Sequence, residues 1–417
     1  MSQHIQPVKG THDILPEEQG PWQRLRRVVE DNLPLYGYRE IATPMFEATE
    51  LFERSVGVAT DIVEKEMYTF ADAKGRRISL RPEGTAGVVR ALVSNGRLRE
   101  HPLDKLYYFG PMFRRERPQK GRFRQFHQFG VEAIGEAGPT LDVEVIALLM
   151  RLLEAVDVTD VALQLNSVGC PDCRPGYREI LVAALQERAD RLCGDCQRRI
   201  VTNPLRVFDC KVPTCGAALA GVPLLLDHLC GACAEHLGRV EAGLAVLAIA
   251  YQINPRLVRG LDYYTRTAFE VVSGALGAQA AVAAGGRYDG LVEELGGPPT
   301  PAIGFAIGLE RLIELMAAEE LAPSLAVYVA ALGAAAQERG LQLADALRRA
   351  GLSCELDHGN RSLKAQLKRA DRLGARKVVI LGDAELATGE VVVRDLTESQ
   401  QQTVSLADLV NTLAGAA

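Results

Sequence analysis

Apolar positions recur with two different periods along the chain, and the change of period marks the predicted elements. In the first 168 residues, apolar side chains three or four positions apart predict helices at 21–36, 48–56 and 139–156. Alternating apolar and polar positions predict strands at 38–47, 106–112 and 124–134. Pro44 interrupts the first of these strands, which is typical of a sheet edge or a bulge.

The pattern changes between residues 169 and 240, where cysteines accumulate around a polar helix predicted at 177–192. This segment has the character of an insertion, because strand patterns return after it at 257–272 and 281–291. A strand that runs directly into a helix is predicted at 301–316.

A segment rich in Ala, Glu and Pro at 317–324 predicts a linker. Beyond it, helices are predicted at 335–350 and 362–373, and strands at 325–332, 377–381 and 390–395. Strands that alternate with helices indicate a compact α/β domain with a mainly parallel sheet. We therefore expect one domain at 1–320, which contains the insertion, and a second domain at 325–417.

Composition places the chain among ordinary globular proteins, with 47% hydrophobic and 24% charged residues in 417 positions. The net charge of −6 neither indicates nor excludes a nucleic-acid partner, because binding depends on local basic patches. The N-terminal residues lack the apolar core of a signal peptide, and the longest apolar stretch, at 322–335, is too short to cross a bilayer. We expect a cytoplasmic protein with no membrane segment.

The segment FRRERPQKGRFRQFHQFGVE at 113–132 combines a basic loop with a polar strand. Its loop holds six basic residues and the single acid Glu116, which alone would indicate a solvated hairpin tip. In the strand that follows, the alternation places Gln128 and Glu132 on one face with Gly130. Such polar groups are costly to bury without partners. A polar pocket floor below a phosphate-binding loop therefore explains the segment better.

Three further segments are less specific when each is taken alone. GFAIGLERL at 304–312 brings Arg311 close to a sheet, although simple packing of a strand and a helix gives the same pattern. RGLDYYTRTAFE at 259–270 and GGRYDGL at 285–291 mix tyrosines with charges. This mixture suits a recognition site, or a half-buried strand with exposed tyrosine tips.

The region 361–377 carries seven basic residues and one acid. Four of them recur at helical spacing and form a stripe: Arg361, Lys364, Lys368 and Arg372. Leu363, Leu367 and Ala370 are predicted to face the core. Such a stripe is a solvated face or an RNA-binding surface.

Eight of the nine cysteines fall between 170 and 233 in four pairs, Cys170/Cys173, Cys193/Cys196, Cys210/Cys215 and Cys230/Cys233. Three C-x-x-C pairs and one wider pair match the ligands of one or two tetrahedral zinc sites with four thiolates each. Reduced, buried thiols that bind no metal are the alternative, and the sequence leaves both open.

Taken in order, KGTHDILP (9–16), RPEGTAG (81–87) and the four segments above resemble the class II histidyl-tRNA synthetases. The resemblance extends from residue 8 into the C-terminal domain, and RGLDYY with GGRYDGL is specific to histidyl enzymes and their paralogues. It implies an antiparallel catalytic sheet flanked by helices, a C-terminal α/β anticodon-binding domain, and a homodimer with Pro44 in the first class II signature. It further implies ATP with magnesium, histidine and tRNA(His) as partners.

The resemblance also implies roles for individual residues. Arg114 and Arg259 would act on the α-phosphate from opposite sides as catalytic residues. The ATP-binding residues would be Arg114, Glu116, Arg122 and Arg311. The histidine-binding residues would be Glu83, Thr85 and Gln128 at the ammonium group and Glu132, Tyr264 and Tyr288 at the imidazole. The basic stripe of the C-terminal domain would bind tRNA, whereas zinc is not a general feature of these enzymes.

Three rivals compete with this interpretation. A histidine-sensing regulatory paralogue would lose the catalytic arginines and the anticodon-binding domain, both of which this chain retains. A synthetase for threonine, proline or glycine would lack RGLDYY and GGRYDGL. A zinc-dependent nucleic-acid-binding module would explain the cysteines alone.

Overall fold

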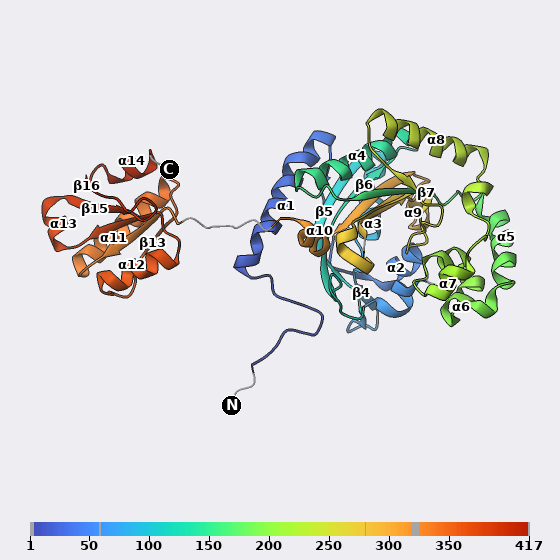
Figure 1. The fold of residues 1–417 in the computed structure, drawn as a ribbon, viewed down its shortest axis with the longest axis horizontal. Coiled ribbons are helices and arrows are strands. Elements are labelled where there is room, and N and C mark those ends of the chain that lie inside the picture. The colour runs from blue at the N-terminus through green and yellow to red at the C-terminus, as the bar shows by residue number, and fades with distance from the viewer. Residues whose placement is uncertain (1–3, 58–59, 280, 318–324, 416–417) are drawn as a thin grey trace. The chain divides into compact units, whose positions relative to one another are not determined.

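The chain folds into two compact units, 1–319 and 320–417 (Figure 1). The computed structural model describes residues 4–57, 60–279, 281–317 and 325–415. The predicted linker at 317–324 therefore lies, apart from Ala317, outside the described residues. None of the described helices has both the length and the apolarity that a membrane crossing requires.

An eight-stranded sheet forms the centre of the first unit. In spatial order its strands are β1 (Arg39–Glu40), β5 (Asp104–Phe113), β6 (Gln125–Ile134), β11 (Ala302–Gly308), β10 (Ala281–Arg287), β9 (Thr265–Val272), β7 (Ala162–Ser167) and β8 (Gln252–Ile253). All neighbours are antiparallel except the two edge pairs, β1 with β5 and β7 with β8. The antiparallel sheet expected from the sequence is thus confirmed, with a parallel strand at each edge.

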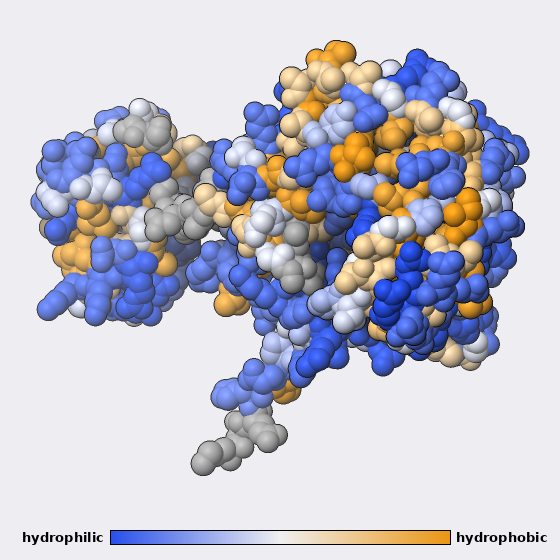
Figure 2. All heavy atoms as spheres, turned by 45° about the vertical axis from the view of Figure 1, so that its right-hand side comes forward, coloured by the Kyte–Doolittle hydropathy of each residue, from blue (hydrophilic) through white to orange (hydrophobic). Residues whose placement is uncertain are grey.

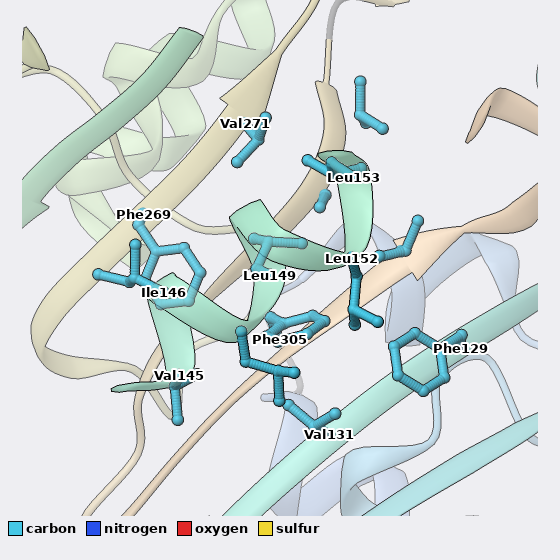
Figure 3. Packing of buried hydrophobic residues seen from close by; sticks show 14 of the residues in the cluster. Phe129, Val131, Val145, Ile146, Leu149, Leu152, Leu153, Phe269, Val271 and Phe305 are labelled. Carbon is cyan, nitrogen blue, oxygen red and sulfur yellow. The ribbon is translucent and has the colours of Figure 1, made fainter. Parts of the chain in front are cut away.

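Helix α4 (Pro139–Ala155) packs its apolar side chains onto one face of this sheet. Figure 3 shows Ile146, Leu149 and Leu152 of α4 among Phe129 and Phe305 of the strands. Successive strand residues point to opposite faces, so Phe129 and Val131 face α4 while Gln128, Gly130 and Glu132 face the other side. This pleat leaves the second face of the sheet available for a polar site.

The N-terminal part follows the predicted elements with shorter bounds. Helix α1 (Gln19–Asn32) ends before Pro34 and continues as a 3₁₀ turn over Leu33–Tyr36. The strand predicted at 38–47 is two separate strands, because Pro44 interrupts it. The second of these, β2 (Phe46–Ala48), pairs with β4 (Arg77–Leu80), which also pairs with β3 (Thr69–Ala71). Four more helices in this unit are α2 (Thr49–Val56), α3 (Thr85–Ser94), α9 (Leu291–Glu294) and α10 (Leu309–Leu315).

The cysteine-rich segment forms a helical subdomain between β7 and β8. Its helices are α5 (Arg174–Gln186), α6 (Gly194–Thr202), α7 (Pro213–Ala218) and α8 (Gly231–Val246). Tyr177, Leu181 and Leu185 of α5 pack with Cys196 and Cys215 in a small core of its own. The subdomain is thus a folded insertion rather than a long loop.

The C-terminal unit is an α/β domain whose sheet is only half parallel. Its strands, in spatial order, are β13 (Cys354–Leu356), β12 (Val327–Ala331), β14 (Lys377–Leu381), β15 (Glu390–Asp395) and β16 (Gln401–Ser405). Its helices are α11 (Ala334–Arg349), α12 (Leu363–Arg372), α13 (Asp383–Thr388) and α14 (Leu409–Ala414). β14 and β15 run antiparallel, as do β15 and β16, so the prediction of a mainly parallel sheet is wrong for this half. The segment between β14 and β15 is too short for a crossover, which needs a dozen or more residues.

A buried carboxylate, that of Asp142 on α4, connects the helices to the sheet. Its Oδ1 accepts a hydrogen bond from Arg287 Nε at 2.8 Å, and its Oδ2 accepts one from Thr267 Oγ1 at 2.6 Å. His236 of α8 lies 2.8 Å from the same Oδ2 through Nε2. Asp142 and Arg287 are both fully buried, so Asp142 depends on Arg287 for compensation of its charge, while Arg287 also pairs with Asp289 at 2.9 Å.

Replacing Asp142 by Ala should therefore destabilise the protein strongly. The variant removes the carboxylate that accepts from Arg287 Nε and leaves Asp289, 2.9 Å from Arg287 Nη1, as the other carboxylate partner of the buried guanidinium. Loss of one member of a buried pair costs up to roughly 3–5 kcal/mol. Urea unfolding of the variant and the wild type measures this difference. Asp142→Asn keeps the side-chain volume and serves as the control for packing; an Asp142→Ala variant as stable as the wild type would contradict the role of the pair.

Candidate active site

A cleft on the second face of the large sheet brings together residues from six separate segments of the sequence. All eleven residues predicted for ATP and histidine line it: Glu83, Thr85, Arg114, Glu116, Arg122, Gln128, Glu132, Arg259, Tyr264, Tyr288 and Arg311. The strands β6, β9, β10 and β11 form its floor, and the loop between β5 and β6 borders it. A shared cleft is the geometry that a two-substrate site requires.

Arginines held by backbone carbonyls gather at one part of the cleft. Arg114 Nε donates to Pro82 O at 2.9 Å, and its guanidinium lies 5.2 Å from the centre of the Phe126 ring. Arg311 of α10 donates to Gly121 O and Ala281 O, both at 3.1 Å. These bonds fix the orientation of the guanidinium groups before any ligand binds.

The charge in this part of the cleft favours an anion. Burial lowers the pKa of Arg311, and the positive charges of Arg122 and Arg114 lower it further against the opposing effect of Glu116. Arg122 Nη1 lies 3.0 Å from Glu116 Oε2, and Arg114 lies 3.7 Å from the same carboxylate. Arg114 and Arg122 thus share the carboxylate of Glu116, while Glu116 and Glu270 both oppose the lowering of the Arg311 pKa. Guanidinium groups gathered in this way suit a phosphate group.

The basic loop has features of both a solvated hairpin tip and a phosphate-binding loop, the two interpretations that its sequence allowed. Arg114, Arg122 and Arg124 are partly buried, and Arg124 Nη1 donates to Lys9 O at 3.2 Å. Arg115, Arg117 and Lys120 are exposed, as expected of a hairpin tip. Arg114 and Arg122 therefore line the cleft, Arg124 contacts the N-terminal segment, and the exposed basic residues lie on the outer side of the loop.

Glu132 is a buried carboxylate at the opposite part of the cleft, 1% exposed. Thr85 Oγ1 donates to its Oε1 at 2.6 Å, and the Tyr288 hydroxyl donates to its Oε2. Both partners are hydroxyl groups rather than arginines. Burial raises the pKa of Glu132 to about 8, although the two hydrogen bonds oppose the rise.

Two glycines provide the space for this part of the site. Gly304 of β11 lies opposite Glu132 in the sheet, and a Cβ at this position would collide with the Glu132 carboxylate. A Cβ at Gly130 would collide with the ring of Tyr108. The missing side chains thus allow a carboxylate and a tyrosine to lie flat against the strands.

Glu83 and Gln128 differ in the capacity they retain for a ligand. Glu83 accepts the backbone N–H groups of Thr85 at 2.6 Å and Ala86 at 3.0 Å, which caps the start of α3. The buried Oε1 of Gln128 has no hydrogen-bond partner among the described residues. A free acceptor in a cleft is costly unless a ligand pairs with it.

Arg259 lies in the loop that precedes β9 and faces the cleft. Its Nη1 is 3.3 Å from Glu270 Oε2, and its guanidinium lies 5.7 Å from the centre of the Tyr264 ring. Its buried Nε has no partner among the described residues. The side chain is therefore held by Glu270 and Tyr264, and its Nε–H remains a donor that a ligand could use.

Sequence reasoning assigned no role to four other polar side chains that line the cleft: Tyr108, Tyr263, Glu270 and Glu310. The signal for Glu270 was available, because it alternates on β9 with the core residues Phe269 and Val271. The same alternation identified Glu132. Glu310 receives the backbone N–H of His127 at 2.9 Å, a contact between distant segments that no local pattern reveals.

The remaining predicted residues lie outside the cleft. Arg361, Lys364, Lys368 and Arg372 are exposed on and beside α12, while Leu363, Leu367 and Ala370 pack on the second unit's core. Hydrophilic residues predominate on the visible face of that unit (Figure 2). The eight cysteines form two groups of four within the insertion, Cys170/Cys173/Cys230/Cys233 and Cys193/Cys196/Cys210/Cys215.

A sheet of this topology, with arginines facing one part of its cleft and a buried carboxylate the other, defines the catalytic unit of a class II aminoacyl-tRNA synthetase. Comparison with known proteins narrows the class. The family model described as histidyl-tRNA synthetase matches residues 10–312, and the one described as anticodon binding domain matches residues 326–415. The chain belongs to the histidyl-tRNA synthetase family.

Individual relatives agree with this assignment over almost the whole chain. The chain is 50% identical over 402 residues to the histidine–tRNA ligase of Trichlorobacter lovleyi, and this alignment covers 96% of both proteins. It is 51% identical over 412 residues to that of Desulforudis audaxviator, which covers 98% of both. The crystal structure of apo histidyl-tRNA synthetase from S. aureus superposes with a TM-score of 0.84 at 36% identity, covering 99% of this chain and 100% of the other.

The buried carboxylate of Glu132 generates a prediction about pH. Its native pKa of about 8 exceeds its ordinary value of 4.5, so between these values the native state holds one proton more than the unfolded state. Stability from this group is therefore lost as the pH rises. The Glu132→Gln variant cannot titrate here. The melting temperature of the variant minus that of the wild type should increase from about pH 6 to about pH 8.

Thermal melts of both proteins in matched buffers measure this difference, and all other titrating groups cancel in the subtraction. A difference that stays constant across the range would show that Glu132 ionises normally in the native protein.

Proposed function

We propose that the protein activates histidine with ATP, forming histidyl-adenylate and pyrophosphate, and then transfers histidine to the 3′ end of tRNA(His). Membership of the histidyl-tRNA synthetase family supports this ligase activity. The observation that carries the proposal is the cleft itself, in which fixed arginines and a buried carboxylate border one space.

We assign ATP to the part of the cleft that holds the arginines. Arg114 would contact the α-phosphate, Arg311 would hold the far end of ATP, and Arg122 would cover it from the loop. Magnesium usually binds through one or two carboxylates together with substrate phosphates. Glu116 and Glu270 line this part of the cleft and fit that requirement. Bound magnesium would neutralise further charge on the phosphates.

Histidine then occupies the part that contains Glu132. The imidazole is mostly neutral at and above pH 7, with one N–H donor and one acceptor nitrogen. Glu132 can accept from the donor, and the hydroxyl groups of Tyr264 and Tyr288 are candidate partners for the ring. Among the ammonium contacts, Gln128 has a free acceptor, whereas Thr85 and Glu83 already bond to protein groups.

In the first step the histidine carboxylate attacks the α-phosphorus, and the bond to pyrophosphate breaks. Two negative groups must approach each other, so guanidinium groups on both sides lower the repulsion and stabilise the charge that develops. Arg114 and Arg259 are the residues we assign to this role. In the second step a terminal ribose hydroxyl of the tRNA attacks the adenylate carbonyl, and AMP leaves.

The second unit supplies the tRNA-binding surface in this proposal. Its match to the anticodon binding domain supports an RNA contact. The exposed basic residues Arg361, Lys364, Lys368 and Arg372 would contact phosphates, which neutralise such a stripe. Lys364, Lys368 and Arg372 lie on one face of α12, and Arg361, which also pairs with Asp357, lies beside the start of this helix.

We further propose a homodimer that acts in the cytoplasm, where its proposed substrates are available. Exposed apolar side chains near Pro44 support an interface there, since Met45 is 50% and Phe46 is 57% exposed. Phe70, on β3 of the same three-stranded sheet as Phe46, is 49% exposed. Grouped apolar side chains of this kind mark association surfaces.

Pyrophosphate exchange with each amino acid in turn tests the function. We expect histidine alone to support exchange. Above about pH 8, where Glu132 with its pKa of about 8 is mostly ionised, the Glu132→Gln variant should raise the KM for histidine by about 10- to 150-fold, because the hydrogen bond to this charged partner is weakened. The KM for ATP should change far less, since Glu132 lies away from the arginines.

Exchange with another amino acid, or none, would contradict the proposal, and the second outcome would favour a histidine-sensing protein. Equal losses for both substrates in the Glu132→Gln variant would remove Glu132 from histidine recognition. Its melting temperature separates a folding defect from either result.

Arg259→Ala should reduce the exchange rate by about 10²-fold or more, as expected for the loss of one preorganised charge donor. Arg151→Ala, an exposed arginine on α4, is the matched control and should exchange normally. Histidine binding, measured by calorimetry without ATP, should change little in the Arg259→Ala variant. Exchange by that variant at the wild-type rate would show that Arg259 does not act on the phosphate.

A further inference from the structure

The two groups of four cysteines in the insertion each have the geometry of a single-ion site. In each group all four sulfur atoms lie within 4.8 Å of one another. Cys170 Sγ is 3.7 Å from Cys173 Sγ and 3.8 Å from Cys230 Sγ, and Cys193 Sγ is 3.8 Å from Cys210 Sγ. Four thiolates around one zinc ion, with Zn–S bonds of about 2.3 Å, are about 3.8 Å apart along each edge of the tetrahedron.

Disulfide bonds and iron clusters fit these sulfur–sulfur distances less well than a single ion does. All nine cysteines are free thiols, and a disulfide would need sulfur atoms about 2 Å apart. A cluster of several iron atoms would hold its four thiolates farther apart. The spacing therefore favours one tetrahedral ion in each group.

The backbone around both groups is arranged to support thiolates. Cys173, Cys193 and Cys230 are the residues that precede α5, α6 and α8, so their sulfur atoms lie at helix starts, where negative charge is stabilised. The N–H of Cys230 donates to Cys173 Sγ, and that of Cys193 donates to Cys215 Sγ, each at 3.1 Å. Each cysteine group thus contains one hydrogen bond from a backbone N–H to a sulfur atom, which is the kind of contact that supports a metal ligand from outside the first coordination shell.

The insertion also holds the loop that enters the candidate active site. Arg174, the residue after Cys173, donates through Nη2 to the backbone oxygen of Tyr264. Arg206, in the turn Pro204–Asp209 that leads into Cys210, donates to the backbone oxygen of Arg259 at 3.0 Å. Each cysteine group thus lies next to one arginine that binds this loop.

A third contact holds the middle of the loop. Asn203, which directly follows α6, donates to Asp262 Oδ1 at 2.7 Å. The loop 259–264 is therefore bound from the insertion at its start, its middle and its end. Because it carries both Arg259 and Tyr264, its position decides where these two side chains stand in the cleft.

We propose that Cys170, Cys173, Cys230 and Cys233 bind one zinc ion, that Cys193, Cys196, Cys210 and Cys215 bind a second, and that the two ions position the loop 259–264 through Arg174 and Arg206. Arg174 and Arg206 are positioning residues, since neither contacts a substrate in the proposed arrangement. The effect on activity rests on the proposed function; the presence of the ions does not.

Metal analysis of the full-length protein, purified without chelator, tests the two sites. We expect two zinc ions per chain in the wild type, and one in each of the variants Cys170→Ser and Cys196→Ser. Cys354→Ser is the matched control, because Cys354 belongs to neither group, and it should retain both ions. Protein without zinc, protein with iron in its place, or cysteine variants that keep both ions would overturn the metal sites.

Kinetics of Arg174→Met and Arg206→Met test the positioning, with Arg239→Met on the exposed face of α8 as control. Both variants should keep two zinc ions. Arg174→Met should raise the KM for histidine roughly 10-fold or more through Tyr264, whereas Arg206→Met should mainly lower the exchange rate through Arg259. Unchanged kinetics in both variants would overturn the positioning. It would also be overturned if the KM for histidine and the exchange rate changed equally and in proportion to a loss in melting temperature. A wild type that holds zinc but does not exchange with histidine would instead contradict the proposed function alone.

Discussion

Asp142 lies on α4, and its carboxylate accepts hydrogen bonds from residues of β9 and β10 and contacts a histidine of α8. Loss of a partner from a buried charge is costly, so these contacts favour the packing in which all of them form. Arg287, its partner on β10, precedes Tyr288, whose hydroxyl enters the cleft. The same contact through α8 joins the sheet to the helix that carries Cys230 and Cys233 at its start. The order of the site therefore depends on one acid that takes no part in it.

The two buried acids of this unit differ in the partners they receive. Asp142 has a guanidinium group, while Glu132 has only the hydroxyl groups of Thr85 and Tyr288. Neutral donors compensate a buried charge less well than a cation does, which explains the raised pKa of Glu132. A ligand that brings its own N–H group would complete the set. The cleft thus combines fixed charged residues with one acid, Glu132, whose protonation state depends on the ligand that binds.

Sequence patterns predicted those features that depend on neighbours in the chain. The alternation along 124–134 predicted the faces of β6 and with them the polar floor at Gln128 and Glu132. Convergence of the eleven site residues came from resemblance rather than periodicity, because the sheet joins segments up to about two hundred residues apart. Asp142 was not found, since one acid within an apolar helix has no local signal. The strand β15 was predicted at 390–395, but its antiparallel pairing was missed, because the pattern shows where strands occur and not how they pair.

The glycines of the cleft determine which changes of specificity are open to this protein. At Gly304 even one methyl group meets the carboxylate below it, and the strand above cannot move away because it pairs on both sides. A larger residue at Gly304 is therefore not a route by which the floor could accommodate a different amino acid substrate. Tyr264 and Arg259 belong to a loop whose supports lie in a separate subdomain. Substitutions intended to change the substrate of this enzyme would therefore begin in the loop 259–264, because changes there leave the strands that form the floor of the cleft intact.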